Sequence, residues 1–155
     1  MAGEDQRVFD EIVAVKDICG DVHLKVILET GELGSYDAIR RASDLALEAG
    51  ADFIKTSTGK IGTSATFPTA VTMCEAIRDY ARRTGRRAGL KVAGGVKNTK
   101  IALTYLVIVK ESLGEGWLTP ELFRIGASSL LDDLLMQLEK ERTGRYAGPD
   151  YFPKD

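Results

Sequence analysis

The stretch ADFIKTSTGK, residues 51–60, is an apolar, strand-like run that ends in a lysine and then passes into small polar residues. Lysine is rare in a buried strand, because its charged amine loses hydration there. Lys91 occupies a similar run, GLKVAGG, at residues 89–95. Runs that are apolar on both faces are typical of a parallel sheet, in which adjacent strands lie about 5 Å apart. The sequence therefore predicts two lysines at the same level of neighbouring strands.

Four such runs are predicted to be strands, and five amphipathic segments are predicted to be helices. The strands are expected at residues 23–29, 53–58, 89–93 and 122–127, and the helices at 8–19, 35–49, 68–83, 98–113 and 128–143. The order is one helix followed by four strand–helix units. This order indicates an α/β fold built from parallel βαβ units.

The bulk properties exclude several classes of protein. The chain has 155 residues, 44% of them hydrophobic and 28% charged, which is typical of one globular domain. Its net charge of −2 gives no general attraction to nucleic acid or to anionic membranes. It has neither an apolar run long enough to span a bilayer nor the apolar core of a signal peptide. We therefore expect a cytoplasmic protein without nucleic-acid or membrane partners.

The cysteines, the histidine and the arginine cluster are predicted to be structural. Cys19 and Cys74 are far apart and form no CxxC motif, so buried free thiols are expected. His23 is the only histidine, which gives little support to a histidine-rich zinc site or a serine protease-type triad. No metal site is expected. The basic segment at residues 82–87 is predicted to be a solvated loop.

The two lysines are the candidates for chemistry. If Lys55 and Lys91 face one pocket, their charges repel and one amine is pushed toward its neutral form. A neutral amine attacks carbonyl groups and forms a Schiff base. The alternative is that each lysine extends from a strand end into solvent.

A second set of residues indicates a phosphorylated substrate. Gly94 and Gly95 precede one predicted helix, and Ser128 and Ser129 precede another. Small residues let backbone N–H groups approach an anion, and a helix N-terminus carries partial positive charge. The pair Gly59-Lys60 would add a cation. Each glycine pair taken alone is equally compatible with an ordinary tight turn.

These residues lie in segments that closely resemble deoxyribose-phosphate aldolases. The segments are LKVILETGEL (24–33), AGADFIKTSTGK (49–60), GLKVAGGVK (89–97) and RIGASSLL (124–131). The resemblance implies a TIM-barrel (β/α)8 fold and class I aldolase chemistry that needs no metal or other cofactor. It implies reversible cleavage of 2-deoxyribose 5-phosphate to acetaldehyde and glyceraldehyde 3-phosphate.

The resemblance also assigns roles to residues. It makes Lys55 the Schiff-base lysine and Lys91 the lysine that perturbs it. Residues matching the phosphate-binding positions of the family are Gly59, Lys60, Gly94, Gly95, Ser128 and Ser129. Val92 stands where the family usually has proline. Members of the family commonly place a C-terminal tyrosine at the site, for which Tyr146 and Tyr151 are the candidates.

The main departure from the family is length. A full barrel has eight strand–helix units, and residues 1–143 resemble only the C-terminal half, followed by a tail at residues 144–155. We expect four strands to leave two open edges and an uncovered apolar face, and hence a homo-oligomer, a complementing half-barrel or a marginally stable fragment. The aspartate of the family's proton relay lies in the absent half. The alternatives are therefore an impaired fragment that binds a phosphosugar without turnover, or a different Schiff-base barrel.

Overall fold

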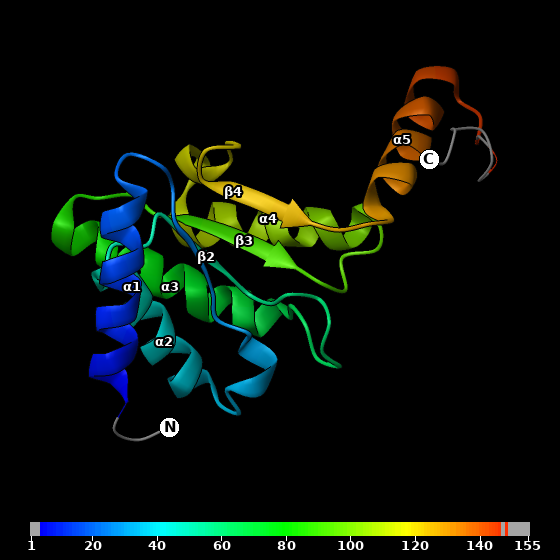
Figure 1. The fold of residues 1–155 in the computed structure, drawn as a ribbon. Helices are drawn as coiled ribbons and strands as arrows, with labels where there is room; N and C mark the ends of the chain where they lie inside the picture. The colour runs from blue at the N-terminus through cyan, green and yellow to red at the C-terminus, as the bar shows by residue number, and fades with distance from the viewer. Residues whose placement is uncertain (1–3, 147, 149–155) are drawn as a thin grey trace.

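The computed structural model describes residues 4–146 and 148, which form one helix followed by four strand–helix units (Figure 1). The α-helices are α1 (Asp5–Cys19), α2 (Tyr36–Glu48), α3 (Phe67–Thr84), α4 (Thr99–Leu113) and α5 (Leu130–Thr143). The strands are β1 (Lys25–Ile27), β2 (Phe53–Lys55), β3 (Gly89–Ala93) and β4 (Phe123–Gly126). Short 3-10 helices η1 (Thr30–Glu32) and η2 (Glu115–Trp117) complete the described chain.

The strands form one parallel sheet in the order β1-β2-β3-β4. This confirms the predicted α/β class and the succession of βαβ units. β3 has the predicted bounds, whereas the other strands are shorter than predicted. β1 ends before Glu29, whose φ of 49° is left-handed and incompatible with a strand. β2 ends at Lys55, because the backbone of Ala93 in β3 bonds to the side-chain hydroxyl of the next residue, Thr56, in place of a backbone group.

Side-chain caps fix the starts of three helices. Ser35, Thr66 and Asn98 accept hydrogen bonds from backbone N–H groups three residues later, at 3.1, 3.3 and 2.9 Å. Such caps satisfy helix N–H groups that have no partner within the helix. α1 begins at Asp5, three residues before the predicted start, and α5 begins at Leu130 rather than at residue 128.

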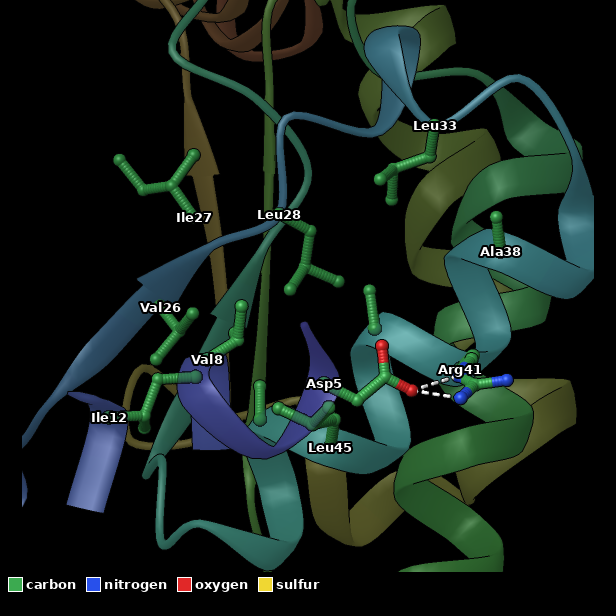
Figure 2. A pocket seen from close by; sticks show the side chains of 12 residues that line it. Asp5, Val8, Ile12, Val26, Ile27, Leu28, Leu33, Ala38, Arg41 and Leu45 are labelled. Carbon is green, nitrogen blue, oxygen red and sulfur yellow. Dashed lines mark hydrogen bonds and ion pairs between the residues drawn. The ribbon is translucent and has the colours of Figure 1, made fainter. Parts of the chain in front are cut away.

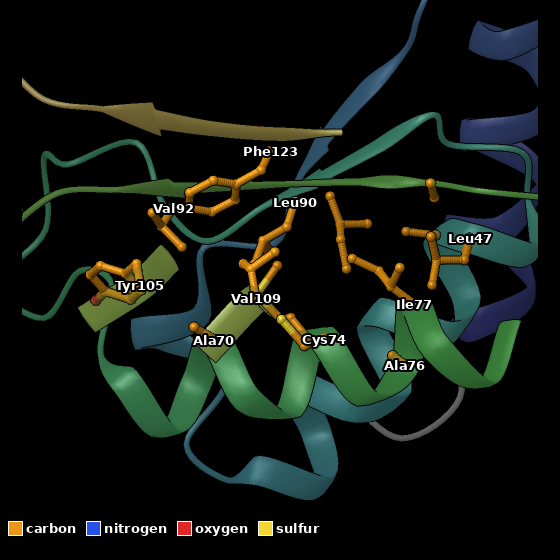
Figure 3. Close-up of a cluster of buried hydrophobic side chains, with 14 of the residues drawn as sticks. Leu47, Ala70, Cys74, Ala76, Ile77, Leu90, Val92, Tyr105, Val109 and Phe123 are labelled. Carbon is orange, nitrogen blue, oxygen red and sulfur yellow. The ribbon is translucent and has the colours of Figure 1, made fainter. Parts of the chain in front are cut away.

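The hydrophobic core lies between one face of the sheet and the helices α2, α3 and α4 (Figure 3). Ile54, Leu90 and Val92 point from the strands toward α3, and all three are fully buried. On α3, Cys74 is buried in this core and unpaired, as predicted. The prediction for Cys19 was wrong in part. This thiol is free, but it lies near the end of α1 and is only half-buried.

The opposite face of the sheet is covered by none of the described helices and is called the open face below. Because side chains alternate along a strand and register partners share a face, it carries the residues Lys25, Ile27, Phe53, Lys55, Lys91 and Arg124. Phe53 is buried even here, beneath the guanidinium of Arg124 at 4.6 Å from the ring centroid. The prediction that the uncovered face is apolar was therefore wrong, because basic side chains occupy most of it.

The amino-terminal end of β3 is closed by Trp117, the only tryptophan of the chain. Its indole Nε1 donates a hydrogen bond of 2.9 Å to the carbonyl of Ala88, and the guanidinium of Arg87 lies 4.3 Å from the ring centroid. Residues 82–87 are exposed, as the sequence predicts, although they begin in the last turn of α3. Within the described part of the chain, no helix is both long and apolar enough to cross a bilayer.

Candidate active site

All eight predicted site residues line one cavity of about 420 Å³ at the carboxyl ends of β2, β3 and β4. These are Lys55, Lys91, Gly59, Lys60, Gly94, Gly95, Ser128 and Ser129. They come from three successive strand–helix loops, so the parallel sheet brings together residues that are up to 74 positions apart in the sequence. The cavity is also lined by Thr58 and Lys97, which the sequence analysis did not select.

Lys55 and Lys91 are register partners on the neighbouring strands β2 and β3. Their side chains therefore leave the sheet on the same face and at the same level, as predicted. Partial burial lowers the pKa of Lys91 below the ordinary lysine value, and the nearby cations Lys25, Lys55 and Arg124 lower it further. Which of the two amines attacks a carbonyl stays a prediction.

Lys25 and Arg124 complete a basic cluster around this pair that the sequence analysis missed. Arg124 is the register partner of Lys91, and Lys25 lies on β1, one step of the same face below the level of Lys55. The signal that identifies them is the register itself. Once the strands are aligned, a basic residue recurs on the open face of all four.

Two glycines make room for the site. A Cβ at Gly126 would lie 2.9 Å from Cε of Lys91, closer than side-chain atoms pack, so glycine here lets the lysine extend along β4. A Cβ at Gly94 would collide with the side chain of Ser64, and φ of 84° at Gly94 is in the left-handed region that favours glycine. The loop after β3 therefore depends on glycine for both its space and its conformation.

Buried hydroxyl groups hold β2 against the end of β3. Thr56 Oγ1 donates to the carbonyl of Ala93 at 3.2 Å and accepts from the N–H of Ala93 at 3.0 Å. Ser57 Oγ donates to the same carbonyl at 2.6 Å. Both side chains are fully buried, so these bonds fix the point at which the chain turns from Lys55 into the cavity loop.

The two helix N-termini at the cavity differ in how they are capped. The Asn98 side chain already accepts from the N–H of Ile101 at α4, whereas Ser129 makes no side-chain cap at α5. Among the described residues, the start of α5 therefore has backbone N–H groups without a side-chain cap, at the point where Ser128 and Ser129 line the cavity. Asp133 ties the two starts together by accepting from the N–H of Thr99 at 2.6 Å. The side chain and the backbone N–H of Thr99 together lower the pKa of the Asp133 carboxyl.

The lining of the cavity is strongly basic. Lys55, Lys60, Lys91 and Lys97 line it, and none of its described lining residues is acidic. The nearby carboxylate of Glu29 is engaged by the Thr58 hydroxyl at 2.6 Å and by the Thr58 N–H at 3.2 and 3.1 Å. The arrangement suits a ligand that carries both a carbonyl group and an anionic group.

The structure describes one of the two candidate tyrosines of the C-terminal tail. Tyr146 contacts Lys140 of α5 and does not line the cavity, and Tyr151 lies outside the described residues. The described part of the chain contains no group of three or more His, Cys, Asp or Glu residues that could hold a metal ion.

Comparison with known proteins gives consistent matches over the whole fold. A family model described as DeoC/LacD family aldolase matches residues 1–135. The chain is 52% identical over 153 residues to a mouse protein named deoxyribose-phosphate aldolase, and 51% identical to the human one. Both matches cover 99% of this chain but 48% of the relative, so the chain spans about half the length of the curated relatives it matches.

Solved structures also match most of this chain over about half of their own length. The apo crystal structure of a putative deoxyribose-phosphate aldolase from Toxoplasma gondii aligns with a TM-score of 0.81 and 34% identity. This alignment covers 90% of the present chain and 54% of that one. A second structure of such a protein from the same organism aligns with a TM-score of 0.76 and 32% identity.

Proposed function

The chain belongs to the DeoC/LacD family of aldolases, and from this premise we propose that it carries the imine-forming and phosphate-binding parts of a deoxyribose-phosphate aldolase. The proposed reaction is the reversible cleavage of 2-deoxyribose 5-phosphate to acetaldehyde and glyceraldehyde 3-phosphate. The observation that carries the proposal is the placement of Lys55 and Lys91 on adjacent strands, opening into a basic cavity at a helix N-terminus.

In the proposed mechanism, neutral Lys55 attacks the aldehyde carbon C1 of the open-chain sugar, and loss of water gives an imine. Removal of the proton from the C3 hydroxyl then breaks the C2–C3 bond. The electron pair moves into an enamine, and glyceraldehyde 3-phosphate leaves. Protonation of C2 and hydrolysis of the imine release acetaldehyde and return the free lysine.

The basic cluster favours the neutral form of an amine at this site. Each cation near the pair raises the cost of protonating its neighbour, so more of the amine is available as a nucleophile. Lys91, whose pKa is lowered, is also better suited than an ordinary lysine to exchange a proton with the intermediates. The phosphate would bind at the N–H groups of α5 and at Lys60, with Gly94 and Gly95 leaving room for it.

The test is reduction of the imine by borohydride in the presence of 2-deoxyribose 5-phosphate, followed by peptide mapping. We expect one adduct, at Lys55. Lys55→Arg keeps the positive charge but removes the nucleophile, and it should abolish the adduct. Lys110→Arg is the matched control, because Lys110 pairs with Glu115 on the outer surface at 2.9 Å and should leave the adduct unchanged.

The outcomes separate the rival functions. An adduct that persists in Lys55→Arg or maps to Lys91 would overturn the assignment of the nucleophile. Stoichiometric binding of the sugar phosphate without adduct or turnover would favour a non-catalytic phosphosugar-binding role. Preference for another phosphorylated aldehyde in a substrate panel would favour a different Schiff-base aldolase.

The proposal also includes an assembly, because the sheet has one uncovered face and two edges. A second copy of the chain and a complementing half-barrel are the two candidates to cover them. The basic side chains of the open face disfavour a second copy, because two such faces would repel each other.

A further inference from the structure

Glu29 has a strained backbone conformation beside the candidate site. Its φ of 49° is left-handed, and among the described residues other than glycine it alone has a positive φ. This conformation costs free energy for any residue with a Cβ, and it persists where the surrounding structure imposes it. Both neighbours are held in place. The N–H of Leu28 donates to the carbonyl of Lys55 at 2.9 Å. The N–H of Thr30 donates to the carbonyl of Thr56, also at 2.9 Å.

Apolar packing fixes the same segment from its other side. Leu28 and Leu33 line an apolar groove of about 500 Å³ between α1, β1 and α2 (Figure 2). Thr30, which follows Glu29, is buried. Glu29 is not among the described residues that line the groove. Its backbone is therefore a fixed base, from which the side chain reaches the loop after β2.

The carboxylate of Glu29 holds the loop at residues 58–60. Its Oε1 and Oε2 accept from the N–H of Thr58 at 3.2 and 3.1 Å, and Oε2 also accepts from the Thr58 hydroxyl at 2.6 Å. The same hydroxyl accepts from the N–H of Lys60 at 3.2 Å. Hydrogen bonds to a charged group are stronger than those between neutral groups. A continuous chain of bonds thus runs from Glu29 through Thr58 to the backbone of Lys60.

This arrangement leaves the charge of Lys60 available to a ligand. Thr58, Gly59 and Lys60 all line the cavity. A carboxylate paired with Lys60 would neutralise the charge that the site offers to an anion. Glu29 instead bonds to the uncharged donors of Thr58, and Lys60 forms no ion pair with a described residue. The loop is therefore held in place without using its cation.

We propose that Glu29 is a positioning residue for the phosphate end of the substrate. Acting through Thr58, it fixes the loop that presents Lys60 to the cavity, and it is not itself among the described lining residues. The inference rests on the proposed function, because it takes Lys60 as a phosphate-binding residue. Binding that depends on the phosphate should need Glu29, whereas imine formation at Lys55 should not.

The test compares two aldehydes, of which only one carries a phosphate. The imine at Lys55 is trapped with borohydride at increasing concentrations of 2-deoxyribose 5-phosphate or of acetaldehyde. In Glu29→Ala we expect the half-saturating concentration of the sugar phosphate to rise about tenfold, with the maximal yield of adduct unchanged. The half-saturating concentration of acetaldehyde should stay within about twofold of the wild-type value. An equal rise for both aldehydes would overturn the proposal.

Two further variants separate the carboxylate from the backbone. Glu32→Ala removes an exposed glutamate at the end of η1, whose side chain bonds to no described residue, and it should leave both concentrations unchanged. Glu29→Gly removes the carboxylate and also relieves the left-handed strain, and it should behave like Glu29→Ala. Wild-type binding of the sugar phosphate by Glu29→Gly would show that only the backbone conformation matters, and it would overturn the proposal.

Glu29→Gln covers the case in which the smaller side chains prevent folding, because glutamine has nearly the same size. Its amide nitrogen cannot accept from Thr58, so at least one bond is lost. We expect a rise of about threefold in the half-saturating concentration of the sugar phosphate. An unchanged concentration in this variant would contradict the role of Glu29.

Amide hydrogen exchange tests the position of the loop without any reaction. The N–H groups of Thr58 and Lys60 should exchange about tenfold faster in the Glu29 variants, while that of Ile54 in β2 keeps its rate. Equal exchange of Thr58 and Lys60 in all chains would overturn the proposal. Faster exchange in a chain whose wild type gives no adduct would count against the proposed function alone.

Discussion

Lys91 depends on the absence of a side chain at Gly126. A methyl group there would lie 2.9 Å from Cε of Lys91 and 3.0 Å from Cβ of Ala93, so the flexible end of the lysine has to move aside. We expect Gly126→Ala to displace the amine and to lower the rate of imine formation by about 100-fold, the effect typical of an ångström-scale misplacement. Single-turnover trapping measures this rate.

The control for that change is Gly62→Ala, because a Cβ at Gly62 would meet nothing within 4 Å. It should leave the rate unchanged. A Gly126→Ala chain that traps substrate as fast as the wild type would show that the position of Lys91 does not matter to the reaction.

The lowered pKa of Lys91 has a consequence for stability. Below its folded-state pKa the amine is protonated in both states, and folding then brings four cations close together, which costs free energy. Between that value and the ordinary lysine pKa of 10.5, the unfolded chain binds more protons, so the free energy of unfolding rises with pH. Urea unfolding between about pH 7 and about pH 10 should show this rise.

Lys91→Met should flatten the rise, because it removes the group whose pKa differs between the two states. Lys110→Met, at a surface ion pair, should keep it. An unchanged slope in Lys91→Met would assign the pH dependence to another group.

At the scale of the elements, the junction of β2 and β3 depends on one buried hydroxyl. Thr56 replaces a regular ladder bond by bonding both backbone groups of Ala93. Thr56→Val keeps the shape but leaves the N–H of Ala93 without this partner in a buried site, and we expect a loss of about 1–3 kcal/mol in the free energy of unfolding. Thr72→Val, which removes an exposed bond to the carbonyl of Pro68, should cost less than half of that. Equal losses in urea unfolding would contradict the role of Thr56.

Local sequence signals account for the helix starts better than for the strand ends. The helix predicted from residue 98 begins at Thr99 in the structure, with Asn98 as its cap. The end of β2 could not be predicted, because Thr56 bonds to Ala93, a residue 37 positions away. The eight site residues could be selected because they lie beside strand ends. Lys25 and Arg124 could not be selected in this way, because only the register of all four strands shows that they share a face with Lys91.

For the whole molecule, Cys74 reports on the integrity of the core. Burial raises the pKa of its thiol to about 12, so the reactive thiolate is scarce at neutral pH, and the side chain is fully buried. We expect a thiol reagent to modify half-buried Cys19 in the native chain and to reach Cys74 only on unfolding. Mass spectrometry of the labelled peptides checks this order, and Cys19→Ser removes the fast reaction. Rapid labelling of Cys74 in the Cys19→Ser chain would show that the core opens without global unfolding.

The position of Trp117 gives the molecule an intrinsic optical reporter. As the only tryptophan, it accounts for the indole fluorescence of the chain, and it is bonded to Ala88 at the amino-terminal end of β3. The candidate site lies at the opposite, carboxyl-terminal end of the same strand. The emission of Trp117 should therefore follow folding of the sheet and stay insensitive to sugar phosphate. Folding can then be monitored independently of ligand binding in one unlabelled sample.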